Sequence, residues 1–257
     1  MGSLGTAPKK LRIAVLDCDT PLEQTKSIYG SYSGRFEVLL RQAAEALNDP
    51  DLISTDRLDI TKWDVEKQEN YPALEDIDAV LLTGSKANAF DNHPWIVKLV
   101  DFIKQLLQHD RVRIIGVCFG HQIVGRALGI KVDRSSAGWE TAVTPVQLTG
   151  KGKDLFKLDK LMIQQMHKDI VYGFADGVEQ LGFTEKCENQ GMYKKGKLIT
   201  VQGHPEFDEQ IIREIVESRH NSGIFTDEWY KECLGHAADK HDGVVVAQAF
   251  LRFLLEE

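Results

Sequence analysis

A cysteine between two glycines, Gly116-x-Cys118-x-Gly120, and a His204-Pro-Glu206 run are the residues whose types and spacing could do chemistry. A cysteine thiolate is a nucleophile, and an imidazole can take up the thiol proton and return it to a leaving group. A carboxylate beside the imidazole can orient it and stabilise its charge. The two segments together therefore suggest covalent catalysis by a cysteine.

Cys118 is predicted to lie at a strand-to-helix corner. A short β-branched run precedes it, and a helical spacing follows it, with the apolar residues Val112, Ile114, Ile115 and Val117, then Ile123, Val124, Ala127 and Leu128. At such a corner the sulfur lies near the positive end of the helix, and the next backbone N–H groups point toward a developing oxyanion. A buried core cysteine is the alternative.

His204 follows a predicted strand at Leu198–Gln202, and Pro205 fixes the backbone so that His204 and Glu206 can project to the same side. Seven other histidines compete for the role of base: His93, His109, His121, His167, His220, His236 and His241. Cys18 is the rival thiol, since it also follows a predicted strand. It has no neighbouring histidine in the sequence, so we interpret it as a packing or loop residue.

Composition limits the function classes. A chain of 257 residues with 42% hydrophobic and 27% charged residues is typical of a globular protein with one sizeable core. The net charge of -8, with no basic stripe, argues against a nucleic-acid partner. No apolar run is long enough for a transmembrane segment, and four widely spaced cysteines suit a reducing compartment, so we expect a cytoplasmic protein.

The N-terminus fits the loose myristoylation pattern at Gly2, with Thr6 in the required place. A disordered leader over residues 1–10 is the interpretation we favour, because that pattern is short. With neither repeats nor a low-complexity linker, residues 11–257 are predicted to form a single domain.

The first half of the chain alternates strands with helices. Apolar runs predict strands at Leu11–Leu16, Leu58–Thr61, Asp78–Thr83 and Val112–Val117. Helical spacing starts at Phe36 and stops at Asn48-Asp49-Pro50, and it starts again at Pro94. This order predicts a doubly wound, mostly parallel α/β sheet of the flavodoxin-like type, whose ligands bind at the carboxyl ends of the strands.

After Gly129 the segments become shorter and hairpin-like, as expected of a smaller antiparallel extension. Its predicted strands are Thr141–Leu148, Leu161–Gln165, Gly191–Lys195 and Leu198–Gln202, with a turn at Lys195-Gly196-Lys197. Helices return around Ile211–Val216 and Val245–Leu254.

Gly116–Gln122 and Gly203–Glu206 together resemble the class I glutamine amidotransferases of the Cys-His-Glu triad type. The likeness covers roughly residues 10 to 220, and further motifs are similar to the stand-alone branch with plant γ-glutamyl peptidases and uncharacterised fungal proteins. These are Thr-Gly-Ser at 83–85, Asp-Asn-His-Pro-Trp-Ile at 91–96, Gly-Trp-Glu at 138–140 and Gln-Met-His-Lys-Asp at 165–169.

The resemblance implies that Cys118 attacks the δ-carbonyl of a γ-glutamyl group to form a thioester. It implies that His204 transfers the thiol proton to the leaving amine and that Glu206 holds His204. The backbone N–H groups of Phe119 and Ser85 would form the oxyanion hole, with Gly84 permitting the turn that aims the second donor.

The resemblance also implies substrate contacts at Gln122, one turn beyond the cysteine, and in a loop at Met166 and His167 whose backbone holds the amino and carboxylate ends of the substrate. Two segments depart from the family pattern: Gly84-Ser85-Lys86 replaces Gly-Gly-Pro, and 166–169 replaces Ser-His-Gly-Asp. Both line the predicted pocket and put strict glutamine specificity in doubt.

Three functions stay open at this point. The chain could be a self-sufficient hydrolase of γ-glutamyl amides, acting on glutamine or on γ-glutamyl peptides. It could be a glutaminase subunit that delivers ammonia to a separate synthetase, or a catalytically silent binding protein. We expect a small-molecule substrate, and the reaction requires no cofactor and no metal.

Overall fold

The computed structural model describes residues 10–49 and 53–256. Residues 1–9 of the expected leader, Gly2 included, lie outside the described residues, and so does Pro50 of the predicted helix stop. The expectations about a leader and about acylation at Gly2 therefore stay predictions.

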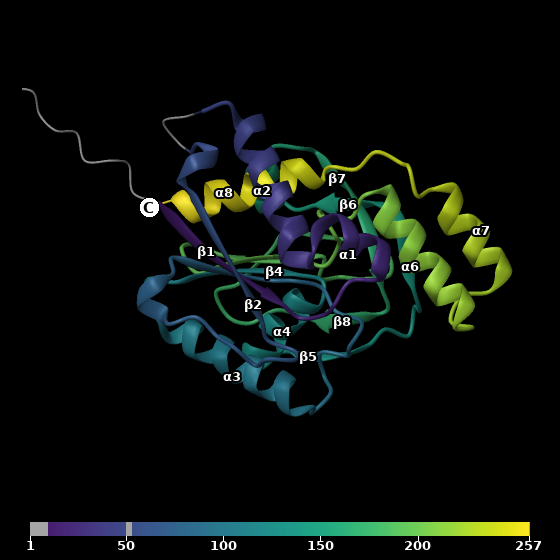
Figure 1. Ribbon diagram of the computed structural model, residues 1–257, viewed down its shortest axis with the longest axis horizontal. Helices are drawn as coiled ribbons and strands as arrows, with labels where there is room; N and C mark the ends of the chain where they lie inside the picture. Colours follow the sequence, from purple (N-terminus) through teal and green to yellow (C-terminus); the bar gives the residue numbers. More distant parts are fainter. Residues whose placement is uncertain (1–9, 50–52, 257) are drawn as a thin grey trace, which may run out of the picture.

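The central sheet has seven strands within these described ranges, in the order β2-β1-β3-β4-β12-β11-β9 (Figure 1). The first five are parallel and the last two run antiparallel to their neighbours. The parallel part has the flavodoxin-like strand order, which confirms the predicted doubly wound fold. The strands are β1 Leu11–Asp17, β2 Leu58–Asp64, β3 Ala79–Leu82, β4 Arg113–Val117, β9 Glu179–Gln180, β11 Gly191–Lys194 and β12 Leu198–Val201.

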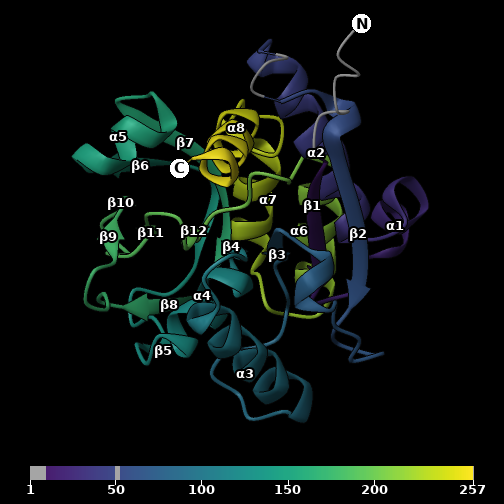
Figure 2. The same cartoon turned by 90° about the vertical axis from the view of Figure 1, so that its left-hand side faces the viewer.

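Helices cover both faces of this sheet (Figures 1 and 2). Helices α2 and α8 pack together on one face, and α3 and α4 pack together on the other. A third group, α6 with α7, extends beyond one end of the sheet in Figure 1. The helices are α1 Glu23–Tyr29, α2 Tyr32–Leu47, α3 Pro94–Gln108, α4 Phe119–Ala127, α5 Gly150–Phe156, α6 Glu209–Asn221, α7 Asp227–Gly235 and α8 Gly243–Leu255.

Strand β1 shows how the two halves of the core are built. Ile13 and Val15 belong to the cluster with α2 and α8, whereas Ala14 and Leu16 belong to the cluster with α3 and α4. All four side chains are fully buried, which explains why the parallel strands read as continuous apolar runs rather than as alternating patterns.

Two small antiparallel sheets form the predicted extension. Their strands are β6 Glu140–Leu148, β7 Lys160–His167 and β10 Gly182–Phe183 in one, and β5 Lys131–Arg134 with β8 Asp169–Tyr172 in the other. The assignment of Leu198–Gln202 to this extension was wrong, because β12 pairs parallel with β4 in the central sheet. Its four buried residues suit that place, and the turn at Gly196, with φ +63°, joins it to β11.

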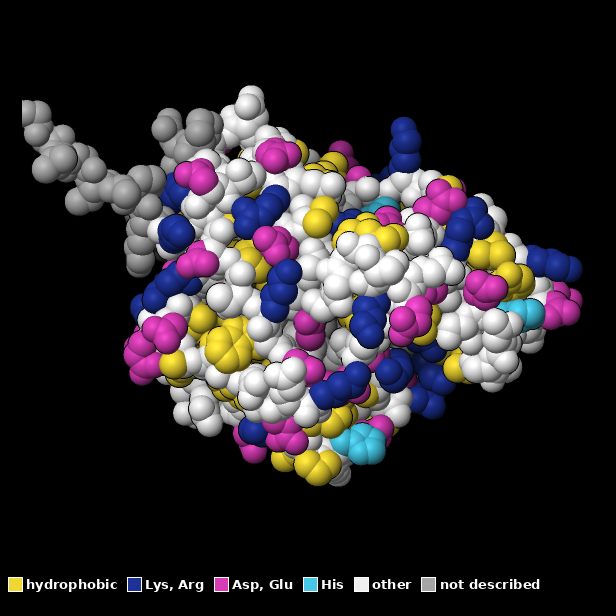
Figure 3. Space-filling model, in the orientation of Figure 1, with side chains coloured by type: hydrophobic (Ala, Val, Ile, Leu, Met, Phe, Trp, Pro, Cys, Tyr) yellow, Lys and Arg dark blue, Asp and Glu magenta, His cyan; other side chains and the backbone are white. Residues whose placement is uncertain are grey.

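The predicted helix at Phe36 begins earlier, at Tyr32, because the Ser31 side chain accepts a hydrogen bond from the Gly34 amide and caps the helix. It ends at Leu47, where Asn48 adopts a left-handed conformation with φ 49°. Among the described residues, no helix is long and apolar enough to cross a membrane. On the face drawn in Figure 3, basic and acidic described side chains are intermixed and form no basic stripe.

Two glycines allow α4 to start close against the sheet. A Cβ on Gly116 would lie 2.8 Å from the Gly120 carbonyl oxygen, and a Cβ on Gly120 would lie 2.5 Å from the Leu82 carbonyl oxygen. Both contacts are far below a normal van der Waals distance. Glycine at these positions is therefore needed for space, and it brings the first turn of α4 directly over the ends of β3 and β4.

We predict that Gly120→Ala lowers the free energy of unfolding by about 1–3 kcal/mol, because the added methyl group meets a backbone oxygen that cannot rotate away. Gly235→Ala is the matched control: it is also a helical glycine, but a Cβ there meets nothing within 4 Å. Denaturant unfolding should show the control unchanged or slightly stabilised. Equal stability of both variants would refute the packing argument.

Candidate active site

Four neighbouring parallel strands, β1, β3, β4 and β12, end at one edge of the sheet. The loops that follow them carry Asp19, Gly84–Lys86, Cys118 and His204–Glu206, respectively. The structure thus brings together segments that are up to 185 residues apart in the sequence, counted from 19 to 204. This is the edge at which doubly wound folds bind their ligands.

Cys118 sits at the predicted corner, between the last residue of β4 and the first residue of α4. Its backbone has φ 51° and ψ -104°, a conformation that non-glycine residues rarely adopt and that costs roughly 1–3 kcal/mol. The Cys118 amide donates to the Val201 carbonyl at 2.9 Å, and the Cys118 carbonyl accepts from the Gln122 amide at 3.0 Å. These bonds hold the strained turn and aim the side chain out of the sheet.

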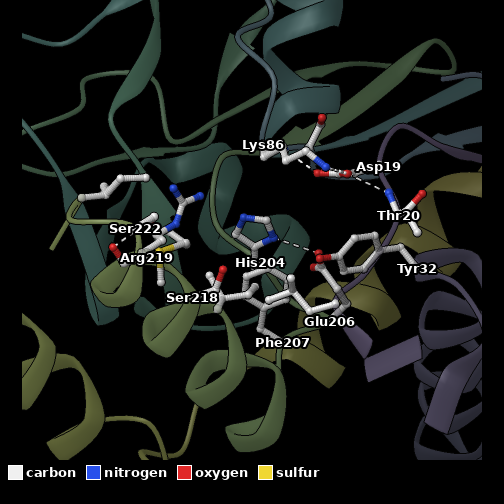
Figure 4. A pocket seen from close by; sticks show the side chains of 16 residues that line it. Asp19, Thr20, Tyr32, Lys86, His204, Glu206, Phe207, Ser218, Arg219 and Ser222 are labelled. Carbon is white, nitrogen blue, oxygen red and sulfur yellow. Dashed lines mark hydrogen bonds and ion pairs between the residues drawn. The ribbon is translucent and has the colours of Figure 1, made fainter. Parts of the chain in front are cut away.

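His204 is fixed by three contacts. Its Nδ1 donates to Glu206 Oε1 at 2.8 Å, its backbone amide donates to the Gln164 carbonyl at 2.8 Å, and its ring stacks on Phe207 with centroids 3.8 Å apart (Figure 4). His204 and Glu206 are both buried, at 4% and 1% exposure. The bond to Glu206 therefore fixes the orientation of the imidazole, with Nδ1–H directed at the carboxylate and Nε2 on the other side of the ring.

Opposing influences set the pKa of His204. Burial, the largest of them, favours the neutral imidazole, but the Cys118 sulfur and the Glu206 carboxylate act together in the other direction and raise the pKa to about 10. The imidazole is therefore protonated at neutral pH. An imidazole of this basicity can hold the proton of a neighbouring thiol, which is what activation of a cysteine nucleophile requires.

Gly84 is the point where the three loops touch. A Cβ at this position would lie 2.7 Å from His204 Cε1 and 3.7 Å from the Cys118 Cβ atom. Any side chain at 84 would push the imidazole out of its place, so glycine is required for a reason beyond the turn that the sequence suggested.

The turn that follows Gly84 is tied to Asp19. The Asp19 carboxylate accepts from the Lys86 amide at 2.8 Å, from Lys86 Nζ at 2.7 Å and from the Thr20 amide at 2.7 Å. A proline at position 86 would lack the amide that makes the first bond. Within the described residues, the amides of Ser85 and Phe119 donate to no protein acceptor, as expected of groups left for an oxyanion.

The residues predicted to contact the substrate lie in two different elements, a helix and the end of a strand. Gln122 is buried, and its Nε2 donates to the Asp169 carbonyl at 2.8 Å and to Gln202 Oε1 at 3.1 Å. Met166 and His167 end strand β7, so the expected loop is wrong at these positions. The His167 side chain pairs with Glu140, Nε2 to Oε2, at 3.0 Å.

Two cavities meet at this site. The smaller, of about 170 Å³, is lined by Cys118, Gln122 and His167, and the larger, of about 400 Å³, by His204 and Glu206. Five residues line both cavities and mark the boundary between them: Ser85, Lys86, Met166, Arg219 and Ile224. Cys118 lines the smaller cavity and His204 the larger one, so they lie on the two sides of this boundary.

Cys18 is no rival to Cys118. Its side chain is fully buried, its Sγ lies 3.5 Å from the Leu16 carbonyl oxygen, and burial raises the pKa of its thiol well above the ordinary range. It packs with α3 and α4 in the core, as the sequence interpretation held.

Sequence reasoning missed the cavity residues Asp19, Tyr32 and Arg219. Asp19 lies in a run of turn-forming residues, and Arg219 is one charged position on the polar helix α6. No local pattern separates either from an ordinary solvated residue. Only the tertiary arrangement assigns them to the site.

Comparison with known proteins places this geometry in context. A family model described as "Glutamine amidotransferase class-I" matches residues 51–218. A glutamine amidotransferase-like protein of Schizosaccharomyces pombe is 38% identical, over 95% of this chain and 98% of its own length. Gamma-glutamyl peptidase 2 of Arabidopsis thaliana is 29% identical, with 84% of each chain covered. A solved glutamine amidotransferase from Thermotoga maritima shares the fold, with a TM-score of 0.71, 18% identity and coverage of 96% and 99%.

We predict that NMR titration of His204 gives a pKa near 10 in the wild-type protein. Cys118→Ala and Glu206→Gln should each lower that pKa, because each removes a negative partner that favours the imidazolium. Cys187→Ala removes a buried thiol that lines neither cavity and should leave the pKa of His204 unchanged. An unaltered His204 pKa in Cys118→Ala would show that no thiolate–imidazolium pair exists.

Proposed function

Because the chain belongs to the class I glutamine amidotransferase family, we propose that it is a cysteine hydrolase that cleaves γ-glutamyl amide bonds through a γ-glutamyl thioester. The observation that carries the proposal is the buried His204–Glu206 hydrogen bond of 2.8 Å beside the strained turn of Cys118. This arrangement supplies a nucleophile, a proton donor and an orienting carboxylate in one place.

Each residue then has one task in the reaction. The Cys118 thiolate forms a bond to the δ-carbonyl carbon, and the Ser85 and Phe119 amides receive the oxyanion. The His204 imidazolium gives its proton to the leaving nitrogen as the carbon–nitrogen bond breaks. Neutral His204 then takes a proton from water, which attacks the thioester and releases glutamate and the Cys118 thiolate. Glu206 holds the imidazole through both steps.

The two cavities fit the two halves of such a substrate. The smaller cavity, beside Cys118 and Gln122, takes the glutamyl group, and the larger cavity, beside His204, takes the leaving group. A water-sized molecule needs only about 10–15 Å³ of such space, whereas this cavity offers about 400 Å³. The excess supports γ-glutamyl peptides as substrates, in line with the names of the Arabidopsis relatives.

The first test compares ammonia release from L-glutamine with amine release from a γ-glutamyl dipeptide, using the purified chain alone. We predict that peptide cleavage dominates and that Cys118→Ala abolishes both reactions, while Glu206→Ala retains more activity than Cys118→Ala. Slow glutamine hydrolysis alone would favour a glutaminase subunit that needs a synthetase. The absence of any reaction that depends on Cys118 would favour a binding protein.

A second test concerns the Asp19–Lys86 tie. Lys86→Pro removes the amide that anchors the turn carrying the Ser85 donor, whereas Lys86→Met keeps that amide and removes only the ammonium group. Because a lost oxyanion donor costs about 10²–10³ in kcat, we expect at least a tenfold lower kcat for Lys86→Pro than for Lys86→Met. Equal kcat values would show that the anchored amide does not position the donor.

A further inference from the structure

The larger cavity contains a cation that forms no ion pair with the residues that the structure describes. Arg219, in the last turn of α6, lines both cavities, and none of the described carboxylates lies within 4 Å of its guanidinium group. Its Nε is buried without a hydrogen-bond acceptor among the described residues. Arg219 as a whole is partly buried, but a guanidinium nitrogen that is buried without an acceptor is costly unless a ligand supplies one.

The other cations around the site are already paired or occupied. Lys86 Nζ bonds to Asp19 at 2.7 Å, and Arg134 Nε bonds to Asp169 at 3.1 Å. Lys168 lies over the Trp139 ring at 5.2 Å and lines only the smaller cavity. Arg219 is therefore the group in the larger cavity that is best prepared to receive an anion.

The position of the Arg219 guanidinium is fixed, although no acceptor in the described part of the chain bonds to it. Its Cζ lies 4.7 Å from the centre of the Trp139 ring, so the planar group rests on an aromatic surface. In Figure 4, Arg219 and Glu206 lie on opposite sides of the His204 imidazole. The carboxylates of the opposite wall bond to other groups: Asp19 bonds to Lys86, and Glu206 bonds to His204 through Oε1, while Glu206 Oε2 has no partner among the described residues.

The rest of the larger cavity is mostly apolar. Five aliphatic or phenyl side chains contribute to its wall: Leu22, Met166, Phe207, Ile215 and Ile224. Leu22 and Ile224 are unusually exposed for their type, at 37% and 47%. A ligand that combines an apolar group with an anion would cover these side chains and also satisfy Arg219.

We propose that Arg219 is the specificity-determining residue for the leaving group and that it binds the free carboxylate of a γ-glutamyl peptide. This inference rests on the proposed function and names its substrate class: γ-glutamyl amino acids or peptides whose leaving group has a carboxylate and an apolar side chain. A bidentate guanidinium–carboxylate contact gives such recognition both geometry and strength. Glutamine and γ-glutamyl amines lack this leaving-group carboxylate.

The test uses three substrates, γ-glutamyl-leucine, its C-terminal amide and L-glutamine, with Cys118→Ala as the blank. The wild-type enzyme should prefer the acid over the amide in kcat/KM by roughly tenfold to hundredfold, the usual worth of a charged hydrogen bond. Arg219→Gln should remove this preference by raising KM for the acid. Arg219→Lys should restore part of the preference, because the charge returns without the planar fork.

Arg213→Gln is the matched control, since Arg213 lies on the same helix, pairs with Glu209 on the exposed surface and lines neither cavity. It should keep the wild-type preference. The inference is overturned if Arg219→Gln retains the preference for the acid. It is also overturned if Arg219→Gln lowers kcat/KM equally for all three substrates, because Arg219 would then serve the glutamyl group or the fold.

Calorimetry with Cys118→Ala separates this inference from the proposed function. If the wild-type protein cleaves none of the substrates, the proposed function fails, but tighter binding of γ-glutamyl-leucine than of its amide, lost in the Cys118→Ala/Arg219→Gln double variant, still supports the anion site. Equal binding of acid and amide to Cys118→Ala would overturn the anion site even if cleavage occurs.

Discussion

The site depends on keeping a protonated imidazole in a buried position. Removing a charge from water costs several kcal/mol unless partners compensate for it, and His204 is only 4% exposed. Its partners are the Glu206 carboxylate and the Cys118 sulfur, which together raise its pKa to about 10. A structure that supports this charge must bring both partners to the imidazole, and the ends of β4 and β12 carry Cys118, His204 and Glu206 to the same edge of the sheet.

The site can form only because backbone segments approach one another closely around it. Gly116 and Gly120 let α4 begin directly over the strand ends, and Gly84 leaves room for the imidazole. Cys118 accepts an unfavourable backbone conformation because hydrogen bonds to β12 and α4 hold it there. The small antiparallel sheets contribute Met166 to the cavity walls, and the helices at the end of the sheet contribute Arg219.

Sequence patterns predicted those parts of the structure that are set by residues close together in the chain. Apolar runs identified the parallel strands, and Cys118, His204 and Glu206 could be named as candidates because Cys118 follows one strand end and the other two follow a second. The place of β12 was not predictable in this way, since a strand reached by a hairpin can pair on either side. The roles of Asp19 and Arg219 depend on contacts with Lys86 and Trp139, which are 67 and 80 residues away in the sequence.

The most direct measurement is to stop the reaction with acid during turnover of a γ-glutamyl peptide and to determine the mass of the intact protein. The thioester mechanism predicts an adduct of one glutamyl group, located on the peptide that contains Cys118 and absent from Cys118→Ala. An adduct on Cys18, or turnover in Cys118→Ala, would contradict the mechanism.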